Sequence, residues 1–202
     1  MKLILVRHGE TIWNKENRVQ GLSDIELNET GKMQIKKLAL DLKNEKIEAI
    51  YSSPIKRACE SALIIGQFHR VDIKFESGLR EMNPGDFEGL TFHELKDRHT
   101  PFLKQWLEDP AAVRMPGGES LHEIQERAWK VVAGILKKSQ NALIVSHNFT
   151  LAAIICKMNN VSLSKFRSVS VDLASKTIFN IVDGSTQLEL LNGRSHLQDP
   201  GN

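Results

Sequence analysis

Cysteine, tyrosine and long hydrophobic runs are scarce in this sequence of 202 residues. The cysteines are Cys59 and Cys156, which lie too far apart in sequence to form a CxxC pair. This spacing excludes a zinc ribbon and a dense disulfide framework, and it favours two free thiols in a reducing compartment. No run of about 18 apolar residues occurs, and the first apolar run, residues 3–6, is too short for a membrane span or a signal-peptide core. The sequence therefore predicts a cytoplasmic protein that does not cross a membrane.

An excess of charge of one sign is also lacking. Lys and Arg number 27 and Asp and Glu number 25, so the formal net charge is +2. Domains that bind nucleic acid are usually strongly basic, so we expect no nucleic-acid partner, although a small basic pocket for an anion remains open. No internal repeat, low-complexity tract or Pro/Gly/Ser-rich linker divides the chain. We therefore expect a single domain over residues 1–202.

Apolar runs and helix-start signals alternate along the chain. We expect strands at 2–6, 47–51, 71–75, 142–145, 169–173, 177–182 and 187–191, and helices at 28–43, 54–66, 121–138 and 149–158. Capping boxes begin at Thr91 and Ser120, and Asp183-Gly184 is a hairpin signal between the last two strands. The alternation of strands and helices predicts an α/β fold, a three-layer α/β/α sandwich with a mostly parallel central sheet.

The helix that starts at 121 has the strongest periodicity in the chain. Its expected buried side is formed by Leu121, Ile124, Ala128, Val131 and Ile135. A second helix is expected to begin with Ser53 as the N-cap and Pro54 as its first residue. The N-terminus of that second helix would add a favourable dipole for a bound phosphate.

Several side chains capable of phosphoryl chemistry follow the ends of predicted strands. Strand 2–6 runs into Arg7 and His8, strand 142–145 runs into His147, and Arg57 lies one turn into the helix after the second strand. Glu81 follows the third strand. Sites in parallel sheets lie beyond the carboxyl ends of the strands, so we expect these five groups to converge. Two imidazoles, two guanidiniums and a carboxylate, without a metal-ligand pattern, fit phosphoryl transfer through histidine.

Five motifs contain these residues, in the same order along the chain. They are Arg7-His8-Gly9-Glu10-Thr11 with Trp13-Asn14, Ser52-Ser53-Pro54 with Arg57-Ala58, Leu79-Arg80-Glu81 with Gly85-Asp86-Phe87-Glu88-Gly89, Pro116-Gly117-Gly118-Glu119-Ser120, and Val145-Ser146-His147. The set resembles the histidine phosphatase superfamily, which includes cofactor-dependent phosphoglycerate mutases and related phosphatases. The resemblance covers residues 1–155 and fades beyond 160. The chain departs from it at Phe87, where tryptophan is frequent, and at Asn148, where glycine is frequent.

The resemblance implies that His8 is a nucleophile that forms a phosphohistidine. A histidine with an ordinary pKa of about 6.5 is partly neutral and nucleophilic at neutral pH, and a backbone carbonyl in the Gly9 turn is expected to hold its other ring nitrogen. The resemblance further implies that three side chains bind the phosphoryl oxygens. These are Arg7, Arg57 and His147.

Glu81 is implied to protonate the leaving alkoxide and then to help water attack the phosphohistidine. Glu10 and Glu88 are nearby alternatives for this carboxylate. Three further polar side chains are candidates for substrate binding, namely Asn14, Gln20 and Asn148. For Gln20 a position in a surface loop is the alternative. Neither a metal nor another cofactor is expected.

We therefore expect a metal-independent phosphatase for small cytosolic phosphomonoesters, with phosphoserine, α-ribazole phosphate and sugar phosphates as candidate substrates. The alternatives are a cofactor-dependent phosphoglycerate mutase and a catalytically silent phospho-ligand binding protein. Family mutases are typically longer between the acid loop and the P-G-G-E motif. Here only residues 90–115 separate these motifs, so we expect water to enter easily and to favour hydrolysis.

The surroundings of the site are less closely determined. The expected pocket walls are Met82, Asn83, Pro84, Phe92, Trp106 and Met115. From about residue 193 the tail is either disordered, which is the favoured interpretation for His196, or folded over the site. In the second case Arg194 or His196 would pair with a substrate carboxylate. An exposed C-terminal strand would allow a homodimer.

Overall fold

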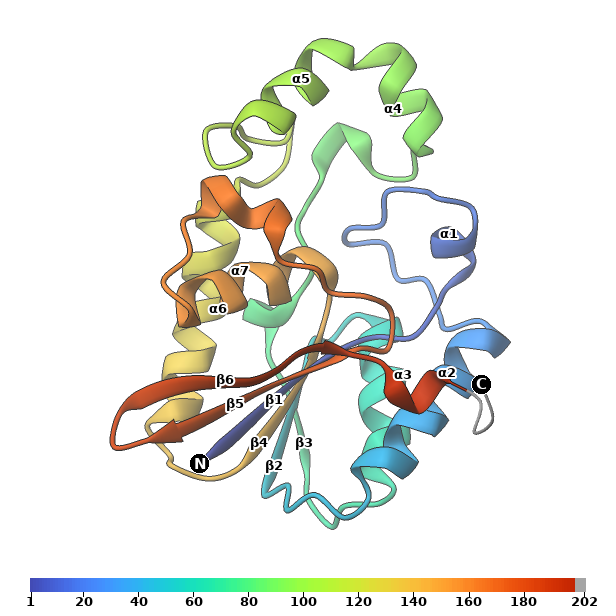
Figure 1. The fold of residues 1–202 in the computed structure, drawn as a ribbon. Coiled ribbons are helices and arrows are strands. Elements are labelled where there is room, and N and C mark those ends of the chain that lie inside the picture. Colours follow the sequence, from blue (N-terminus) through green and yellow to red (C-terminus); the bar gives the residue numbers. More distant parts are fainter. Residues whose placement is uncertain (199–202) are drawn as a thin grey trace.

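A six-stranded sheet with the order β3-β2-β4-β1-β5-β6 crosses the centre of the molecule (Figure 1). The computed structural model describes residues 1–198. The strands are β1 (Lys2–Arg7), β2 (Ala49–Ser52), β3 (Ile73–Phe75), β4 (Ala142–Ser146), β5 (Lys176–Val182) and β6 (Ser185–Gly193). Strands β3, β2, β4 and β1 are parallel to one another. Strand β5 pairs antiparallel with β1, and β6 pairs antiparallel with β5. The carboxyl ends of the four parallel strands therefore meet at one edge.

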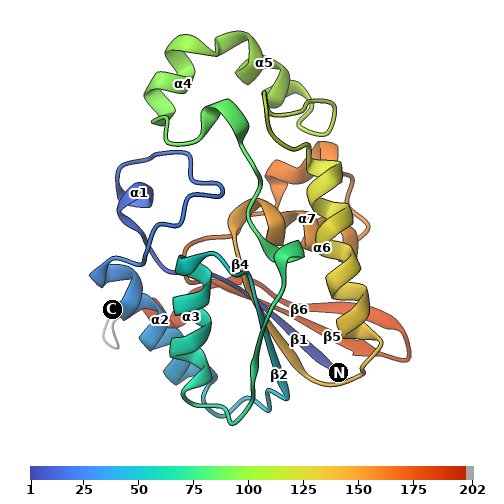
Figure 2. The same ribbon diagram turned by 180° about the vertical axis from the view of Figure 1, so that it is seen from behind.

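Helices cover both faces of this sheet (Figure 1, Figure 2). The four long helices are α2 (Glu29–Leu42), α3 (Lys56–Gly66), α6 (Leu121–Leu136) and α7 (Asn148–Met158). Side chains alternate between the two faces along a strand, so Ile4 and Val6 pack with α2 and α3, while Leu3 and Leu5 pack with α6 and α7. The expected three-layer α/β/α sandwich is confirmed.

Three of the expected helix starts and the expected hairpin turn are found where the sequence placed them. The Asn28 side chain accepts the Gly31 N–H at the start of α2, and capping boxes at Thr91 and Ser120 open their helices. Asp183 and Gly184 join β5 to β6 with φ of 50° and 76°, a conformation that Gly adopts readily. These signals act over a few residues, which is why they could be predicted.

Two helices differ from their predicted limits. Helix α6 ends at Leu136 rather than at 138, and Val132 is buried on its inner side, whereas Val131 is only partly buried. Helix α3 begins at Lys56, not at Pro54, and Ser53 is not its N-cap. The Ser53 hydroxyl lies 2.8 Å from His147 Nε2, and the Lys56 N–H instead donates to the Asp24 carboxylate at 2.7 Å. This helix N-terminus therefore faces Asp24, so the expected dipole for a phosphate is not provided there.

Residues 169–173 form a loop, not the predicted strand. The loop follows a 3₁₀ segment, η3 (Leu163–Ser168), and it contacts the end of β1. The Val171 carbonyl accepts from Arg7 Nη1 at 2.7 Å, and the Ala174 N–H donates to the His8 carbonyl at 3.1 Å. Backbone groups of this loop therefore bind the last residue of β1 and the residue after it. The loop lies beside the site and does not add a strand to the sheet.

Residues 90–115 form a helical cap above the carboxyl edge of the sheet (Figure 1, top). The cap consists of α4 (Phe92–Arg98) and α5 (Thr100–Glu108). Phe92, Leu95, Phe102 and Trp106 of these helices line a cavity at that edge. Two short helices therefore stand over the site, and the expectation that water enters it easily stays a prediction.

The last described residues pack beside the sheet, away from the cap. The 3₁₀ segment η4 (Ser195–Leu197) contacts α2, and His196 Nε2 lies 3.0 Å from the Ala174 carbonyl. Arg194 pairs with Asp172 at 2.9 Å. Up to residue 198 the tail is neither disordered nor folded over the cap cavity, and residues 199–202 lie outside the described part. Within residues 1–198 no helix has the length and apolar character needed to cross a membrane.

Candidate active site

Four of the predicted site residues meet at the carboxyl edge of the sheet. β1 and β4 are parallel neighbours with Arg7 opposite Ser146, so the residues that follow, His8 and His147, come together with ring centroids 5.1 Å apart. Arg57 of α3 comes within 3.3 Å of His8, and Glu81 lies in the loop after η1 (Ser77–Leu79). All four are almost fully buried, with exposed fractions of 0–4%. The predicted convergence is confirmed for these four residues, and the fifth, Arg7, lines the same cavity as His8 and Glu81.

The contacts of His8 leave one ring nitrogen available. Nδ1 lies 2.7 Å from the Gly9 carbonyl, so it carries the proton, as expected from the sequence. Nε2 then has a free lone pair, and it accepts from Arg57 Nε at 3.3 Å. Burial, together with the charges of Arg57 and Arg7, holds the pKa of His8 well below its usual value. His8 is thus a neutral imidazole with Nε2 unprotonated at neutral pH.

Arg57 is held by the loop at residues 21–23. Its Nη1 donates to the Ser23 carbonyl at 2.9 Å and its Nη2 to the Gly21 carbonyl at 2.8 Å. Burial lowers the pKa of Arg57 to about 10, while Glu81 and Glu88 act in the opposite direction, so the guanidinium remains charged at neutral pH. A buried cation fixed in this way is preorganised to bind an anion.

Glu88 supports the same loop from its other side. Its carboxylate accepts the backbone N–H groups of Gly21, Leu22 and Ser23 at 3.1, 3.2 and 2.7 Å. Glu88 does not line the cap cavity, whereas Glu81 does. The other alternative carboxylate, Glu10, accepts from the Asn28 side chain at 2.7 Å. The geometry therefore favours Glu81 for the acid and gives Glu88 a positioning role behind Arg57.

A Glu88→Gln variant is expected to weaken the binding of inorganic phosphate by about tenfold, because a neutral amide cannot accept all three N–H groups. Isothermal titration calorimetry measures this affinity, and the exposed Glu126→Gln on α6 is the matched control. Unchanged phosphate affinity in Glu88→Gln would show that the loop holds Arg57 without this carboxylate.

Arg7 and His147 each have a buried nitrogen without a partner. His147 Nε2 lies 2.8 Å from the Ser53 hydroxyl, whereas its Nδ1 has no hydrogen bond. Arg7 donates from Nη1 to Val171, but its Nε is also unpaired. Burial, the positive charges of Arg57 and Arg7 and the neighbouring His8 lower the pKa of His147 well below its usual value. Buried polar groups are nearly always paired, so two unpaired donors at one place indicate a site for an acceptor-rich ligand.

Glu81 is bound by the first turn of α7. Its Oε1 accepts from the backbone N–H groups of Met82 at 2.9 Å and Thr150 at 3.2 Å, and its Oε2 accepts from Phe149 at 3.3 Å. These donors fix both carboxylate oxygens relative to the helix that follows His147. The position of Glu81 is therefore tied to that of His147 through α7.

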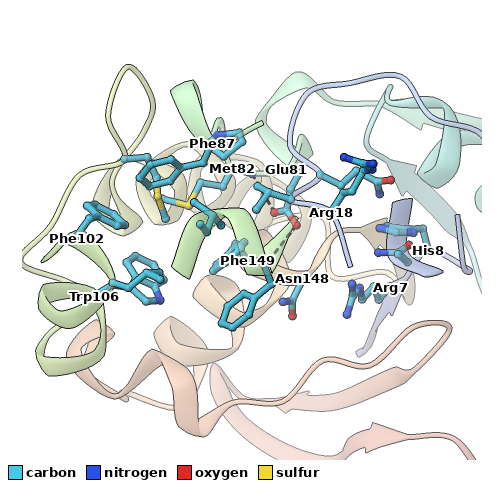
Figure 3. Close-up of a pocket in the computed structure, with 18 residues that line it drawn as sticks. Arg7, His8, Arg18, Glu81, Met82, Phe87, Phe102, Trp106, Asn148 and Phe149 are labelled. Atoms are coloured by element: carbon cyan, nitrogen blue, oxygen red, sulfur yellow. Dashed lines mark hydrogen bonds between the residues drawn. The ribbon is translucent and has the colours of Figure 1, made fainter. Parts of the chain in front are cut away.

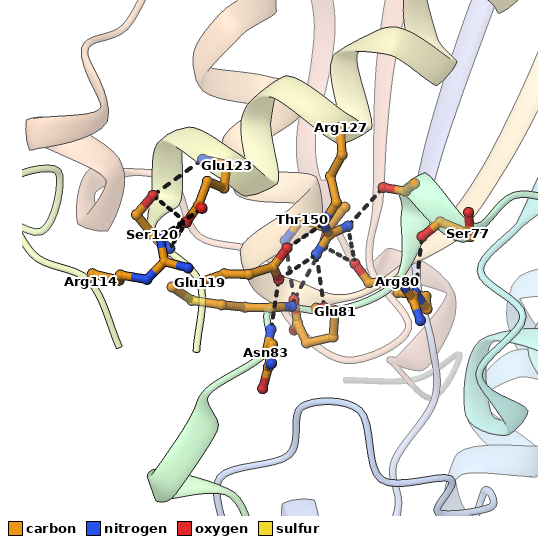
Figure 4. A network of polar contacts seen from close by, with 12 residues as sticks. Ser77, Arg80, Glu81, Asn83, Arg114, Glu119, Ser120, Glu123, Arg127 and Thr150 are labelled. Atoms are coloured by element: carbon orange, nitrogen blue, oxygen red, sulfur yellow. Dashed lines mark hydrogen bonds and ion pairs between the residues drawn. The ribbon is translucent and has the colours of Figure 1, made fainter. Parts of the chain in front are cut away.

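Arg127 of α6 holds the loop that carries Glu81 (Figure 4). It donates to the Gly78, Arg80 and Glu81 carbonyls at 2.7–2.9 Å. It also pairs with Glu119 at 2.8 Å, and Glu119 accepts the Asn83 N–H at 2.8 Å. Glu119, from the P-G-G-E motif, thus has an identifiable task, which is to connect α6 to the acid loop.

His8 and Glu81 line a cavity of about 270 Å³ (Figure 3), whereas Arg57 and His147 lie behind them and do not line it. Its polar end is lined by Arg7, His8, Asn14, Arg18, Gln20, Glu81 and Asn148. Met82, Pro84, Phe92, Trp106 and Met115 line the remainder, as expected, together with Phe87, Phe102 and Phe149. Asn83 does not line it, because its Oδ1 accepts the Gly85 N–H within the loop. Arg18 was missed by sequence reasoning, since it lies outside every motif.

The candidate binding residues Asn14, Gln20 and Asn148 all reach this cavity. Asn14 Oδ1 accepts the Thr11 N–H at 3.1 Å, and Gln20 Oε1 lies 2.7 Å from the Thr11 hydroxyl. With both amide oxygens engaged, their NH₂ groups remain to donate. Arg194 and His196 do not line this cavity. Within the described chain, no cluster of three or more His, Cys, Asp or Glu side chains is arranged to hold a metal ion.

The free energy of unfolding is expected to fall as the pH drops below about 6.5, since His8 and His147 protonate readily only in the unfolded chain. Above that pH both histidines are neutral in the folded and in the unfolded chain, so stability does not depend on them. Below the histidine pKa of the unfolded chain, the free energy of unfolding falls by up to roughly 1 kcal/mol per pH unit for each histidine. Carboxylates with lowered pKa, such as Glu123 at about 2, act only in a more acidic range.

Urea unfolding at about pH 7 and about pH 5.5 measures this slope. A His8→Ala variant should show a shallower dependence than the wild type, and the exposed His122→Ala should match the wild type. Equal slopes in all three proteins would contradict the assignment of two buried neutral imidazoles.

Comparison with known proteins agrees with this geometry. The family model of the histidine phosphatase superfamily (branch 1) matches residues 3–194. Phosphoserine phosphatase 1 of Hydrogenobacter thermophilus is 35% identical over 199 residues, which cover 98% of this chain and 94% of the relative.

Solved structures are similar over almost the whole chain. Bacillus stearothermophilus YhfR superposes with a TM-score of 0.92 at 30% identity, covering 98% of this chain and 99% of that chain. A phosphoserine phosphatase mutant from Entamoeba histolytica, in complex with phosphoserine, has a TM-score of 0.85 at 26% identity, with coverage of 98% and 99%. The chain therefore belongs to branch 1 of the histidine phosphatase superfamily and is an enzyme of the phosphomonoester hydrolase class.

Proposed function

We propose that the chain hydrolyses small phosphomonoesters through a phosphohistidine on His8, without a metal ion. The observation that carries this proposal is the state of His8, a buried neutral imidazole whose unprotonated Nε2 lies 3.3 Å from Arg57 Nε. An unprotonated nitrogen beside a fixed cation is suited to attack a bound phosphoryl group.

In the first step the Nε2 lone pair attacks phosphorus and the bond from phosphorus to the ester oxygen breaks. Glu81, protonated at this stage, gives its proton to that oxygen, so the product leaves as a neutral alcohol. Arg7, Arg57 and His147 donate hydrogen bonds to the non-bridging oxygens. Such charge-assisted bonds contribute roughly 1.5–3 kcal/mol each, and they supply the electrostatic stabilisation that a magnesium ion gives in many other phosphoryl-transfer enzymes.

In the second step a water molecule enters where the alcohol has left. Glu81, now a carboxylate, takes a proton from this water as its oxygen attacks phosphorus, and the bond to Nε2 breaks. Inorganic phosphate and free His8 result, and Glu81 is protonated again. The NH₂ groups of Asn14 and Gln20 line the cavity beside His8 and can donate to the phosphoryl group throughout.

Hydrolysis is favoured over a mutase reaction by the phosphoserine phosphatase relative and by the short segment between the acid loop and the P-G-G-E motif. The 35% identical relative named phosphoserine phosphatase spans nearly both chains. The candidate substrates remain phosphoserine, α-ribazole phosphate and sugar phosphates. We also place the enzyme in the cytoplasm, a location supported by two cysteines that are both free thiols.

Phosphate release from a panel of phosphomonoesters, with and without EDTA, tests the proposal. We expect turnover that EDTA does not reduce. Phosphoglycerate mutase turnover primed by 2,3-bisphosphoglycerate, if it exceeded hydrolysis, would replace the proposal by a mutase. Binding of phosphate without turnover of any ester would indicate a phospho-ligand binding protein.

A further inference from the structure

The cavity beyond Glu81 has a wall of aromatic and sulfur-containing side chains. Phe149, Trp106 and Phe166 pack on one another, with ring centroids 5.4–6.3 Å apart. Phe102 contacts Phe87 at 4.8 Å and stacks near Trp106 at 6.5 Å. The rings that line the cavity come from α5, α7 and the acid loop (Figure 3). Phe166 of η3 packs against Trp106 and Phe149 without lining the cavity.

We infer that this wall, together with Met82 and Met115, is a binding subsite for an apolar, ring-sized leaving group. The inference rests on the proposed function, because it assigns the leaving group of the proposed hydrolysis. The subsite favours phosphomonoesters whose alcohol carries an aromatic or bulky hydrocarbon group. It disfavours small esters whose alcohol is zwitterionic or carries a carboxylate.

The position of Glu81 determines where the leaving group lies. The ester oxygen must lie close to the Glu81 carboxylate to receive its proton. Met82 follows Glu81 directly, and the Phe149 N–H donates to Glu81 Oε2 at 3.3 Å. Both side chains line the cavity beside the carboxylate. The atoms bonded to the ester oxygen therefore enter the cavity between these two apolar side chains.

The distribution of charge excludes a good fit for an amino-acid leaving group. Every cap residue that lines the cavity is apolar, and they are Phe92, Leu95, Phe102, Leu103 and Trp106. Arg18 belongs to the polar end of the cavity, and its Nε and Nη1 already donate to Glu16 at 2.7 Å and to the Gly89 carbonyl at 3.0 Å. An ammonium or carboxylate placed against the wall would lose its hydration without a full set of partners, which is costly.

The size of the cavity points the same way. About 270 Å³ is near the lower end of cavities that bind small molecules. Aromatic rings packed edge to face are rigid and bury a large apolar area, so a ring inserted among them gains contact without much ordering of the wall. A glycerate-sized group would leave much of this apolar surface uncovered.

In a series of alkyl phosphates with the same O–CH₂ linkage, the leaving alcohols have similar acidity. Differences in kcat/KM within the series therefore report on how the hydrocarbon group binds. We expect kcat/KM for 2-phenylethyl phosphate to exceed that for ethyl phosphate by about 30- to 100-fold, from burial of the ring. It should also exceed kcat/KM for phosphoserine and for 3-phosphoglycerate. Phosphoserine turned over faster than 2-phenylethyl phosphate would overturn the inference and leave the proposed hydrolysis intact.

Two variants on α5 link the preference to the wall. Trp106→Ala is expected to lower the ratio of 2-phenylethyl to ethyl phosphate kcat/KM by about tenfold, since the largest ring of the wall is removed. Leu107→Ala, an exposed neighbour on the same helix that does not line the cavity, should keep the wild-type ratio. An unchanged ratio in Trp106→Ala would contradict the subsite.

The binding of phosphonates tests the subsite even without turnover. We expect 2-phenylethylphosphonate to bind at least tenfold more tightly than ethylphosphonate by calorimetry, and Trp106→Ala to remove this difference. Failure of every ester to react would disprove the proposed hydrolysis, whereas equal affinity of the two phosphonates would disprove the subsite.

Discussion

His8→Ala is expected to reduce kcat by about 10⁴-fold or more, because the proposed reaction has no path without the nucleophilic nitrogen. His147 is near but cannot replace it, since its Nε2 lies 2.8 Å from the Ser53 hydroxyl and its Nδ1 is the nitrogen that donates a proton to the phosphoryl group in the proposed reaction. The loss should appear for every phosphomonoester, as the attacking atom is common to all of them.

Rapid quenching of wild-type enzyme with ³²P-labelled substrate gives a second readout of the same step. A phosphohistidine is labile in acid and stable in base, so the label should survive alkaline quenching and be lost in acid. The His8→Ala chain should carry no label, and the exposed His122→Ala should carry as much as the wild type. Label retained in His8→Ala would place the nucleophile elsewhere.

Glu81→Gln is expected to slow the hydrolysis of alkyl phosphates by about 10²- to 10⁴-fold, the range for loss of a general acid. Alkoxides are poor leaving groups and need the proton that Glu81 provides. p-Nitrophenolate leaves without a proton, so p-nitrophenyl phosphate should still phosphorylate the enzyme. The variant should therefore show a burst of nitrophenolate equal to the enzyme concentration, followed by slow dephosphorylation.

The comparison with Glu10→Gln separates Glu81 from one of the two alternative carboxylates. Glu10 is hydrogen-bonded to Asn28 and is outside the cap cavity, so its variant should lose less than about tenfold. Absence of a burst in Glu81→Gln, or a larger loss of activity in Glu10→Gln than in Glu81→Gln, would show that Glu81 is not the general acid.

Much of this site could be predicted from the sequence because strand ends determine it. Buried apolar runs locate β1 and β4 directly, and parallel pairing then brings the residues after them, His8 and His147, to one edge. The Nδ1 contact of His8 was also predictable, since the Gly9 carbonyl is only one residue away. The start of α2 at Asn28 and the capping boxes follow from equally short-range signals.

The features that escaped prediction depend on contacts between distant segments. Ser53 looks like a helix cap, but His147, 94 positions further along, binds its hydroxyl. Residues 169–173 have the composition of a strand, yet Val171 binds Arg7, and Ala174 directly after them binds His8. Arg18 has no motif around it, and its place at the cavity depends on how the loop after α1 (Ile12–Lys15) folds back. No local pattern encodes such pairings.

The cap and the sheet contribute different parts of the cavity, and this division has a consequence for altering the enzyme. The phosphoryl end is built from strand ends, α3 and α7, whereas much of the far wall comes from α4 and α5. Directed evolution restricted to the exposed or cavity-facing positions of these two short helices should therefore change which alcohol is accepted. The transfer step itself should persist through such changes, because none of its groups resides there.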